Sequence, residues 1–309
     1  MRPDDTWGNQ SVSSMNTVAI CAIQQNESPY LLEWIAFHLN AGVDHIRVYD
    51  NDSSDMSLAI LNAIAAKYPI SVVAHPTVRG VSPQLSAYRD GIDWLRGRTE
   101  FVAFIDLDEF LFGEQSRPLR EILHAVDNDV AAIGINQRIF GSNAETEFHP
   151  ELVTARFTHR APIDAPGNQF FKSIARVRQI REPDIHNVVL ATGLYVFSDG
   201  SPLRTSMDHP GRATRIVRGQ IVLHHYLTKS RAEFETKRLR GGAAASTAET
   251  RKGRHTAEGF DWINLDANSE SDMTLWSVAD RTRAKMREIL GAVGANLPRE
   301  AIELYQPLV

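Results

Sequence analysis

The sequence predicts an α/β protein with a mainly parallel sheet in its first half and a mixed second half. Four short apolar runs lie between residues 18 and 105, helical patterns separate them, and this regularity loosens after about Asp127. Strands joined by single helices form right-handed crossovers. We therefore expect the first four strands to lie parallel, with helices on both faces of the sheet.

Each element of the first half has its own sequence signal. The apolar runs have the length of buried strands and span residues 18–23, 46–49, 70–73 and 101–105. The first helix is expected to start with Ser28 as N-cap and Pro29 as first helical residue, and to stop at Gly42. The second helix should end before Pro69 and the third before Gly97, since both residues interrupt the apolar repeat.

The second half contains strand-like runs between longer loops rich in Pro and Gly. These runs cover residues 130–135, 170–177, 188–197 and 220–226. A helix over residues 229–240 is predicted by the capping box from Ser230 to Glu233 and by the Gly241-Gly242 pair that follows. A last amphipathic helix from Ser277 to Leu290 should pack on the outside.

Composition restricts the possible classes of protein. The chain has 309 residues and a formal net charge of −5, so it shows no overall basic character for binding nucleic acid. Its one cysteine, Cys21, cannot form an intrachain disulfide, which fits a reducing compartment. No apolar run reaches the length of a membrane span, and we expect a cytoplasmic protein without a transmembrane segment.

The clearest chemical signal is an acidic strand end. An apolar run over residues 101–105 is followed at once by Asp106 and Asp108. Residues i and i+2 of an extended segment share a face, so both carboxylates could bind one ligand at the carboxyl edge of the sheet. Carboxylate oxygens suit Mg²⁺ or Mn²⁺. The simpler interpretation is a solvated strand end, but the buried approach favours a metal.

A second acidic cluster, residues 50–55, follows the second predicted strand. A calcium loop is excluded because Asp55 stands where that loop needs Gly and Leu61 where it needs Glu. Asp55 or Ser54 is expected to cap the next helix. Asp50 would then remain free to bind a base or ribose.

Taken together, these segments resemble glycosyltransferase family 92 and its bacterial relatives, which have a GT-A fold. The resemblance covers most of the chain and depends on the order and combination of the pieces. They are Asn26-Glu27, residues 30–35 with His38, residues 49–55, Gln84 with Tyr88, residues 104–110, residues 140–142, residues 172–174 with Arg176, His186, His225-Tyr226, residues 228–230, Glu233-Phe234, Lys237 and Arg240-Gly241.

The resemblance implies a GT-A-like three-layer αβα fold and transfer of a sugar from a nucleoside diphosphate donor, preferably UDP-linked, with Mn²⁺ or Mg²⁺. Composition predicts a flexible leader at residues 1–16, and we expect a catalytic domain over residues 17–245, followed by a mobile segment and helical extension at 246–309. The implied metal ligands and donor contacts are Asp106, Asp108 and His225 for the metal, and Glu27, Asp50, Gln84, Asp106, Lys229 and Lys237 for the donor. Periodicity alone cannot choose between His224 and His225.

Relatives in this family are expected to invert the anomeric centre, which requires a base at the acceptor hydroxyl. The candidates in the second half are Glu145, Glu147, Asp164 and His186. Asp164 is preferred, without geometric support. The acceptor is expected to be a saccharide or another hydroxyl compound. Lys229, Lys237 and Arg240 could close over the diphosphate, although cations on a helix more often form a solvated face.

Two other functions also fit parts of the sequence. Haloacid-dehalogenase phosphatases use an Asp-x-Asp strand end with the first Asp as nucleophile, which would make Asp106 the reacting group. In those enzymes the pair belongs to the first strand, whereas here it follows the fourth. The second alternative is a non-catalytic nucleotide-sugar-binding module that keeps the acidic pair.

Overall fold

The computed structural model describes residues 17–240 and 256–309. The predicted leader at 1–16 and most of the predicted mobile segment, residues 241–255, lie outside the described residues, as does the Gly241-Gly242 helix stop. The boundary placed near residue 245 remains a prediction.

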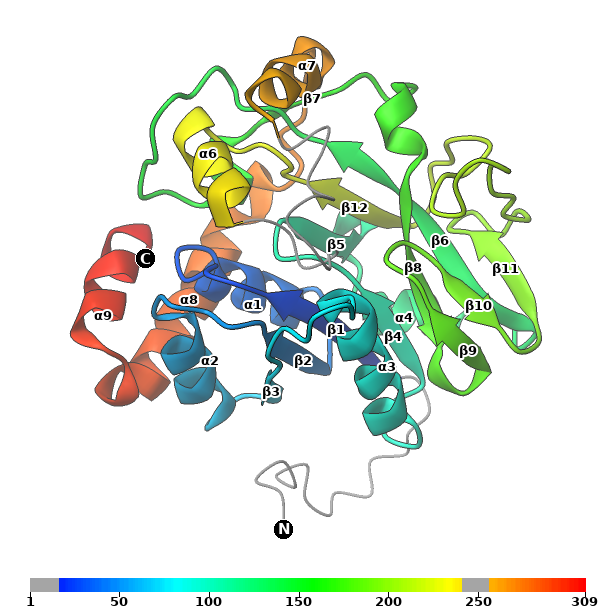
Figure 1. The fold of residues 1–309 in the computed structure, drawn as a ribbon, viewed down its shortest axis with the longest axis horizontal. Helices are drawn as coiled ribbons and strands as arrows, with labels where there is room; N and C mark the ends of the chain where they lie inside the picture. The colour runs from blue at the N-terminus through cyan, green and yellow to red at the C-terminus, as the bar shows by residue number, and fades with distance from the viewer. Residues whose placement is uncertain (1–16, 241–255) are drawn as a thin grey trace.

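A nine-stranded sheet forms the centre of the described residues, in the order β3-β2-β1-β4-β8-β6-β12-β5, with β11 paired to β6 (Figure 1). The first four strands pair in parallel, as the sequence predicts. In the second half β8 lies antiparallel to both β4 and β6, whereas β12 and β11 lie parallel to β6. The strands of this sheet are β1 Val18–Gln24, β2 His45–Asp50, β3 Ile70–Ala74, β4 Phe101–Phe104, β5 Glu109–Gly113, β6 Val130–Ile139, β8 Phe171–Arg176, β11 Leu194–Phe197 and β12 Ile221–His225.

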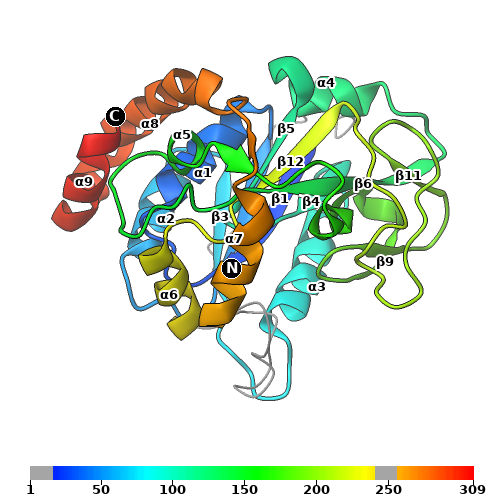
Figure 2. The same ribbon diagram turned by 90° about the horizontal axis from the view of Figure 1, so that it is seen from above.

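Helices cover both faces of the sheet, which confirms the predicted α/β fold class (Figure 2). Alternate residues of β1 divide between two cores: Val18 and Ile20 pack with the α1 and α2 side, and Ala19 and Cys21 with the α3 side. The remaining short strands are β7 His159–Arg160, β9 Ile180–Pro183, β10 Val188–Leu190 and β13 Glu270–Ser271. The α-helices are α1 Leu31–Asn40, α2 Ser57–Ala65, α3 Pro83–Leu95, α4 Leu119–His124, α5 Val153–Arg156, α6 Arg231–Arg240, α7 Ala257–Ala267, α8 Ala279–Val293 and α9 Arg299–Tyr305.

Some predicted boundaries are wrong for local reasons. Helix α1 begins at Leu31, because the carbonyl oxygen of Glu27 accepts hydrogen bonds from the backbone of Tyr30 and Leu31 and forms a turn through Ser28. The run predicted as one strand over residues 188–197 is divided into β10 and β11 by a turn at Gly193, whose φ is +91°. Strand β5 and helix α4 were not predicted.

The last helices pack against the first one. Helix α8 lies along α1 (Figure 2), and its Met286 and Ile289 are fully buried in the same core as the α1 side of the sheet. The hydroxyl of Tyr305 in α9 donates a hydrogen bond to the carbonyl oxygen of Ser28. The C-terminal helices therefore support the segment between β1 and α1. None of the helices in the described ranges is long and apolar enough to cross a bilayer.

Gly141 is a close-packing position. A Cβ atom there would lie 2.3 Å from Oδ1 of Asn268 and 2.6 Å from the carbonyl oxygen of Ala267, at the end of α7. We expect Gly141→Ala to lower the free energy of unfolding by about 1–3 kcal/mol, measured by urea denaturation. Gly291→Ala in α8 is the matched control, because nothing lies within 4 Å of its added Cβ. Equal stability of the two variants would contradict this steric role.

Candidate active site

The acidic pair lies in a tight turn between β4 and β5. Strand β4 ends at Phe104, so Asp106 and Asp108 are not on an extended segment as the sequence argument assumed. The backbone N–H of Glu109 donates to the carbonyl oxygen of Asp106 at 3.1 Å, and the Asp106 N–H donates to Oε2 of Glu109 at 2.8 Å. This turn, rather than strand alternation, directs the two carboxylates.

Asp106 is held by two side chains from other elements. Lys172 of β8 donates to its Oδ2 at 2.9 Å, and Gln84 of α3 donates to its Oδ1 at 2.9 Å. Burial alone would raise the pKa of Asp106, but the Lys172 ammonium outweighs it and lowers the pKa. Lys172 also lies 3.4 Å from Oε2 of the fully buried Glu109. One ammonium therefore lies beside two neighbouring carboxylates. Gln84, predicted as a donor contact, orients Asp106 here.

Asp108 faces a different set of groups. Its Oδ2 accepts a hydrogen bond from Lys237 of α6 and lies 3.5 Å from Nε2 of His225. Burial opposes ionisation, but the Lys237 ammonium outweighs it, so the pKa of Asp108 lies well below its usual value. Asp108 is therefore an ionised, 5% exposed carboxylate.

His225 and His224 lie on opposite faces of β12. His224 is fully buried among aromatic rings, and burial lowers its pKa to about 3. His225 points toward Asp108, and its Nδ1 lies 2.7 Å from Oε1 of Gln137. The geometry thus brings His225, rather than His224, to the acidic turn.

A divalent cation fits the oxygen and nitrogen donors at this point. Adjacent ligands of an ion with bonds of about 2.1 Å lie about 3 Å apart, close to the 3.5 Å between Asp108 and His225. Asp106 is ion-paired elsewhere, and among the described residues no group of three or more His, Cys, Asp or Glu side chains is arranged to hold a metal ion. The protein would supply two ligands, and the remaining positions would fall to donor oxygens and water.

Lys229 lies near Asp108, and its backbone conformation is strained. Its φ of +53° is in the left-handed region, which non-glycine residues rarely adopt outside special sites. The side chain is 4% exposed, and its Nζ lies 4.1 Å from the centre of the Tyr30 ring. Burial lowers the pKa of Lys229, partly offset by the charges of Glu27 and Asp108. A buried ammonium near Asp108 is suited to bind an anionic group.

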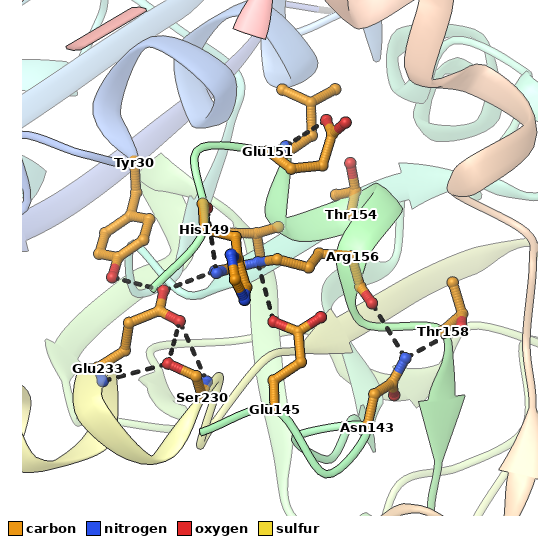
Figure 3. A network of polar contacts seen from close by, with 12 residues as sticks. Tyr30, Asn143, Glu145, His149, Glu151, Thr154, Arg156, Thr158, Ser230 and Glu233 are labelled. Atoms are coloured by element: carbon orange, nitrogen blue, oxygen red, sulfur yellow. Dashed lines mark hydrogen bonds and ion pairs between the residues drawn. The ribbon is translucent and has the colours of Figure 1, made fainter. Parts of the chain in front are cut away.

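A polar network fixes α6, the helix that carries Lys237 (Figure 3). Glu233 and Ser230 form the predicted capping box, which is confirmed by their reciprocal hydrogen bonds. Oε1 of Glu233 also accepts hydrogen bonds from the Tyr30 hydroxyl at 2.8 Å and from Arg156 at 2.7 Å. Glu145 lies 3.7 Å from Arg156 on the other side. The start of α6 is thereby tied to Tyr30, directly before α1, and to Arg156 at the end of α5.

The predicted nucleoside contacts lie at the ends of β1 and β2. Asp50 is 4% exposed and accepts hydrogen bonds from Nε2 of Gln24 and, at 3.3 Å, from the N–H of Ser53. The Asp50 carboxylate therefore already has partners within the protein, because the polar ends of the two strands bond to each other, and its contact with the nucleoside remains a prediction. Oδ1 of Asp55 accepts a hydrogen bond from the N–H of Ser57, the first residue of α2, at 2.9 Å, although the N-cap position itself is Met56. Glu27 is 6% exposed and begins the turn into α1.

The base candidates belong to other segments of the chain than the acidic turn. Asp164 lies on an exposed loop, and its carboxylate forms no hydrogen bond or ion pair with any described residue. Glu145 belongs to the Arg156 network, and burial raises its pKa. Glu147 is exposed, and the His186 ring packs on Phe170. The base remains a prediction.

The sheet and the site together define a GT-A-like domain: a parallel α/β half, an Asp-x-Asp turn at its carboxyl edge and a mixed second half. Residues 16–196 match the family model of glycosyltransferase family 92, more than half of the chain. The chain belongs to glycosyltransferase family 92. This membership confirms the resemblance read from the sequence and gives no support to the phosphatase alternative.

Two plant relatives illustrate the match. A family 92 protein of Oryza sativa subsp. japonica is 26% identical over 214 residues, covering 68% of this chain and 33% of the relative. A family 92 protein of Ricinus communis is 26% identical over 213 residues, with 68% and 35% covered. The chain thus spans about a third of the length of these relatives.

Solved structures show only a distant likeness. S. aureus TarS 1–349 in complex with UDP-GlcNAc gives a TM-score of 0.37 at 14% identity, covering 93% of this chain and 83% of that chain. Glucosyl-3-phosphoglycerate synthase from Mycobacterium tuberculosis, in complex with Mn²⁺, UDP and phosphoglyceric acid, gives 0.31 at 13% identity, covering 53% and 57%.

Proposed function

We propose that the protein transfers a sugar from a nucleoside diphosphate donor, preferably UDP-linked, to a hydroxyl group of a saccharide or another acceptor, with inversion. The observation that carries this proposal is the approach of Asp108 and His225 to 3.5 Å at the carboxyl edge of the sheet, with Lys229 and Lys237 beside them. Carboxylate, imidazole and ammonium groups are the partners that a metal-bound diphosphate requires.

Asp108 and His225 would hold Mn²⁺ or Mg²⁺, and Asp106 would reach the ribose or the metal from its position between Lys172 and Gln84. When bound, the cation would supply Lewis-acid stabilisation of the charge that develops on the leaving diphosphate. Glu27 and Asp50, at the ends of β1 and β2, would bind the nucleoside.

Lys237 must change partners in this proposal. It is ion-paired with Asp108, so the same carboxylate oxygen cannot bind a divalent cation until the ammonium leaves. Once free, Lys237 would pair with the diphosphate together with Lys229. Both lysines would then stabilise negative charge on the leaving group through preorganised contacts.

Proton removal from the acceptor needs a further group. Asp164 is our proposed base, since it is an exposed carboxylate on the loop before β8 and has no competing partner among the described residues. Its water-exposed position requires that the acceptor bind beside that loop.

The metal part of the proposal is tested by calorimetry of UDP binding with and without Mn²⁺. We expect UDP to bind at least about 10-fold more tightly with Mn²⁺, because the cation joins the diphosphate to Asp108 and His225. Equal affinity in both conditions would contradict the bridging cation. Turnover with a panel of UDP- and GDP-sugars separates a transferase from a binding module, which would bind donors tightly without hydrolysing them.

A further inference from the structure

The orientation of the Gln137 side chain is set by a backbone carbonyl group. Its Nε2 lies 2.8 Å from the carbonyl oxygen of Gly167, and its Oε1 lies 2.7 Å from Nδ1 of His225. A carbonyl oxygen only accepts hydrogen bonds, so the amide nitrogen of Gln137 must face Gly167. The amide oxygen therefore faces the His225 ring.

The segment that provides this carbonyl is itself fixed to β6. Asn168 accepts a hydrogen bond from the N–H of Ile139 at 3.0 Å, and its carbonyl oxygen accepts one from Asn136 at 3.1 Å. A Cβ atom on Gly167 would lie 2.7 Å from Cδ1 of Ile139, so glycine permits this close approach. The Gly167 carbonyl is therefore a rigid reference for Gln137.

The same reasoning determines the proton position on His225. The Gln137 amide oxygen only accepts hydrogen bonds, so Nδ1 of His225 must carry a proton. In the neutral ring Nε2 then has a lone pair, and it lies 3.5 Å from Oδ2 of Asp108. The Nε2 lone pair and the Asp108 oxygen are two buried acceptors that face each other, an arrangement that is stable when a cation binds both.

A carboxylate in place of the amide would act differently. Oε1 of Glu109 is the nearest alternative, at 3.6 Å from Nδ1, beyond hydrogen-bond range, and it has no hydrogen-bond partner in the described part of the chain. A carboxylate bonded to Nδ1 would accept the same hydrogen bond but would add a further negative charge to this buried acidic surrounding. The neutral amide of Gln137 accepts the bond without adding charge.

We propose that Gln137 is a positioning residue that fixes the Nδ1–H tautomer of His225 and so presents Nε2 as a cation ligand beside Asp108. Gln137 lies in β6 and is 5% exposed. Its side-chain amide bonds His225 and Gly167, so it would act on the cation through His225. This inference rests on the proposed function for the presence of the cation. The tautomer itself is a property of the metal-free protein and can be measured separately.

The test compares Gln137→Met, which keeps the side-chain length without polar atoms, with Gln137→Glu, which keeps an acceptor. Nitrogen-15 NMR of histidine-labelled, metal-free protein reports the tautomer, with the His225 signals assigned by their absence in His225→Gln. Electron paramagnetic resonance gives the Kd for Mn²⁺ without donor. Gln220→Met is the matched control, because its amide oxygen accepts a hydrogen bond from the exposed Arg117 side chain and, within residues 17–240 and 256–309, its amide has no other partner.

We expect wild type and Gln220→Met to show the Nδ1–H tautomer, and Gln137→Met to lose it and bind Mn²⁺ about 10- to 100-fold more weakly. Gln137→Glu should retain Nδ1 donation and recover part of the Mn²⁺ affinity. An Nε2–H tautomer in wild type, or unchanged tautomer and Kd in Gln137→Met, would overturn the proposal. A tautomer lost in Gln137→Met with no Mn²⁺ binding even in wild type would support Gln137's role and instead overturn the proposed cation site.

Discussion

Asp108→Asn should abolish Mn²⁺-dependent binding of UDP and lower donor turnover by about 100-fold or more, since it removes the negative charge that would hold the cation beside the leaving diphosphate. The amide keeps the shape of the side chain but loses the negative charge that both the cation and Lys237 require. The Lys237 side chain is 22% exposed and can turn to water, so the fold should persist. Calorimetry, a donor-hydrolysis assay and thermal denaturation measure the three quantities.

Two further variants make this result specific. Asp280→Asn should behave as wild type in every assay, because the Asp280 side chain at the start of α8 is fully exposed. Asp164→Asn should keep Mn²⁺-dependent UDP binding and lose transfer to acceptor, because the proposed base acts only on the acceptor proton. Full turnover by Asp108→Asn would place the chemistry at another site.

Lys172→Met should lower the free energy of unfolding by about 3 kcal/mol at pH 8, because it leaves a buried carboxylate without its cation. Lys172 is 2% exposed and Glu109 is fully buried, so water cannot replace the ammonium. Burial lowers the pKa of Lys172, but Asp106 and Glu109 outweigh it and raise the pKa. Urea denaturation measures the loss. Lys285→Met is the control: it removes the partner of Glu288 in an ion pair on the surface of α8 and should lower the free energy of unfolding by less than about 0.5 kcal/mol.

The deficit of Lys172→Met should depend on pH in a defined direction. Burial already raises the pKa of Glu109 above its ordinary value of 4.5, and loss of Lys172 raises it further. A carboxyl with a raised folded-state pKa binds more protons when folded, so stability falls as the pH rises from the unfolded pKa through the folded one. The difference from wild type should therefore be smaller at pH 5 than at pH 8. A deficit that grows as the pH falls would contradict the pairing of Lys172 with Glu109.

Much of the fold could be predicted because local patterns agree with the tertiary structure in the first half. Strands buried on both faces appear as continuous apolar runs, and helices between them fix a parallel order. Strand β5 was missed because it follows the acidic pair directly and its apolar run is only three residues long, Phe110-Leu111-Phe112. Its pairing with β12 joins Glu109 to His225 across a long sequence separation, which no local pattern reveals.

The candidate site could be predicted only where residues follow a strand end. Asp106 and Asp108 carry such a signal, and the family motif added His225. Gln137 was missed because it lies within β6, where Asn136, Gln137 and Arg138 interrupt an otherwise apolar strand. Three polar residues in a central strand are the signal that could have identified it, since buried polar groups need partners. The pairing of Lys172 with two carboxylates depends on sheet order and had no such signal.

The position of Cys21 has a practical consequence. It is the only cysteine of the chain, it is fully buried in β1, and a Cβ on Gly91 of α3 would lie 2.6 Å from its sulfur. Burial also raises the pKa of its thiol, which keeps it in the unreactive form. A spin label or fluorophore attached to a cysteine introduced at exposed Thr236 of α6 would thus report movement of this helix alone, without first removing the native thiol.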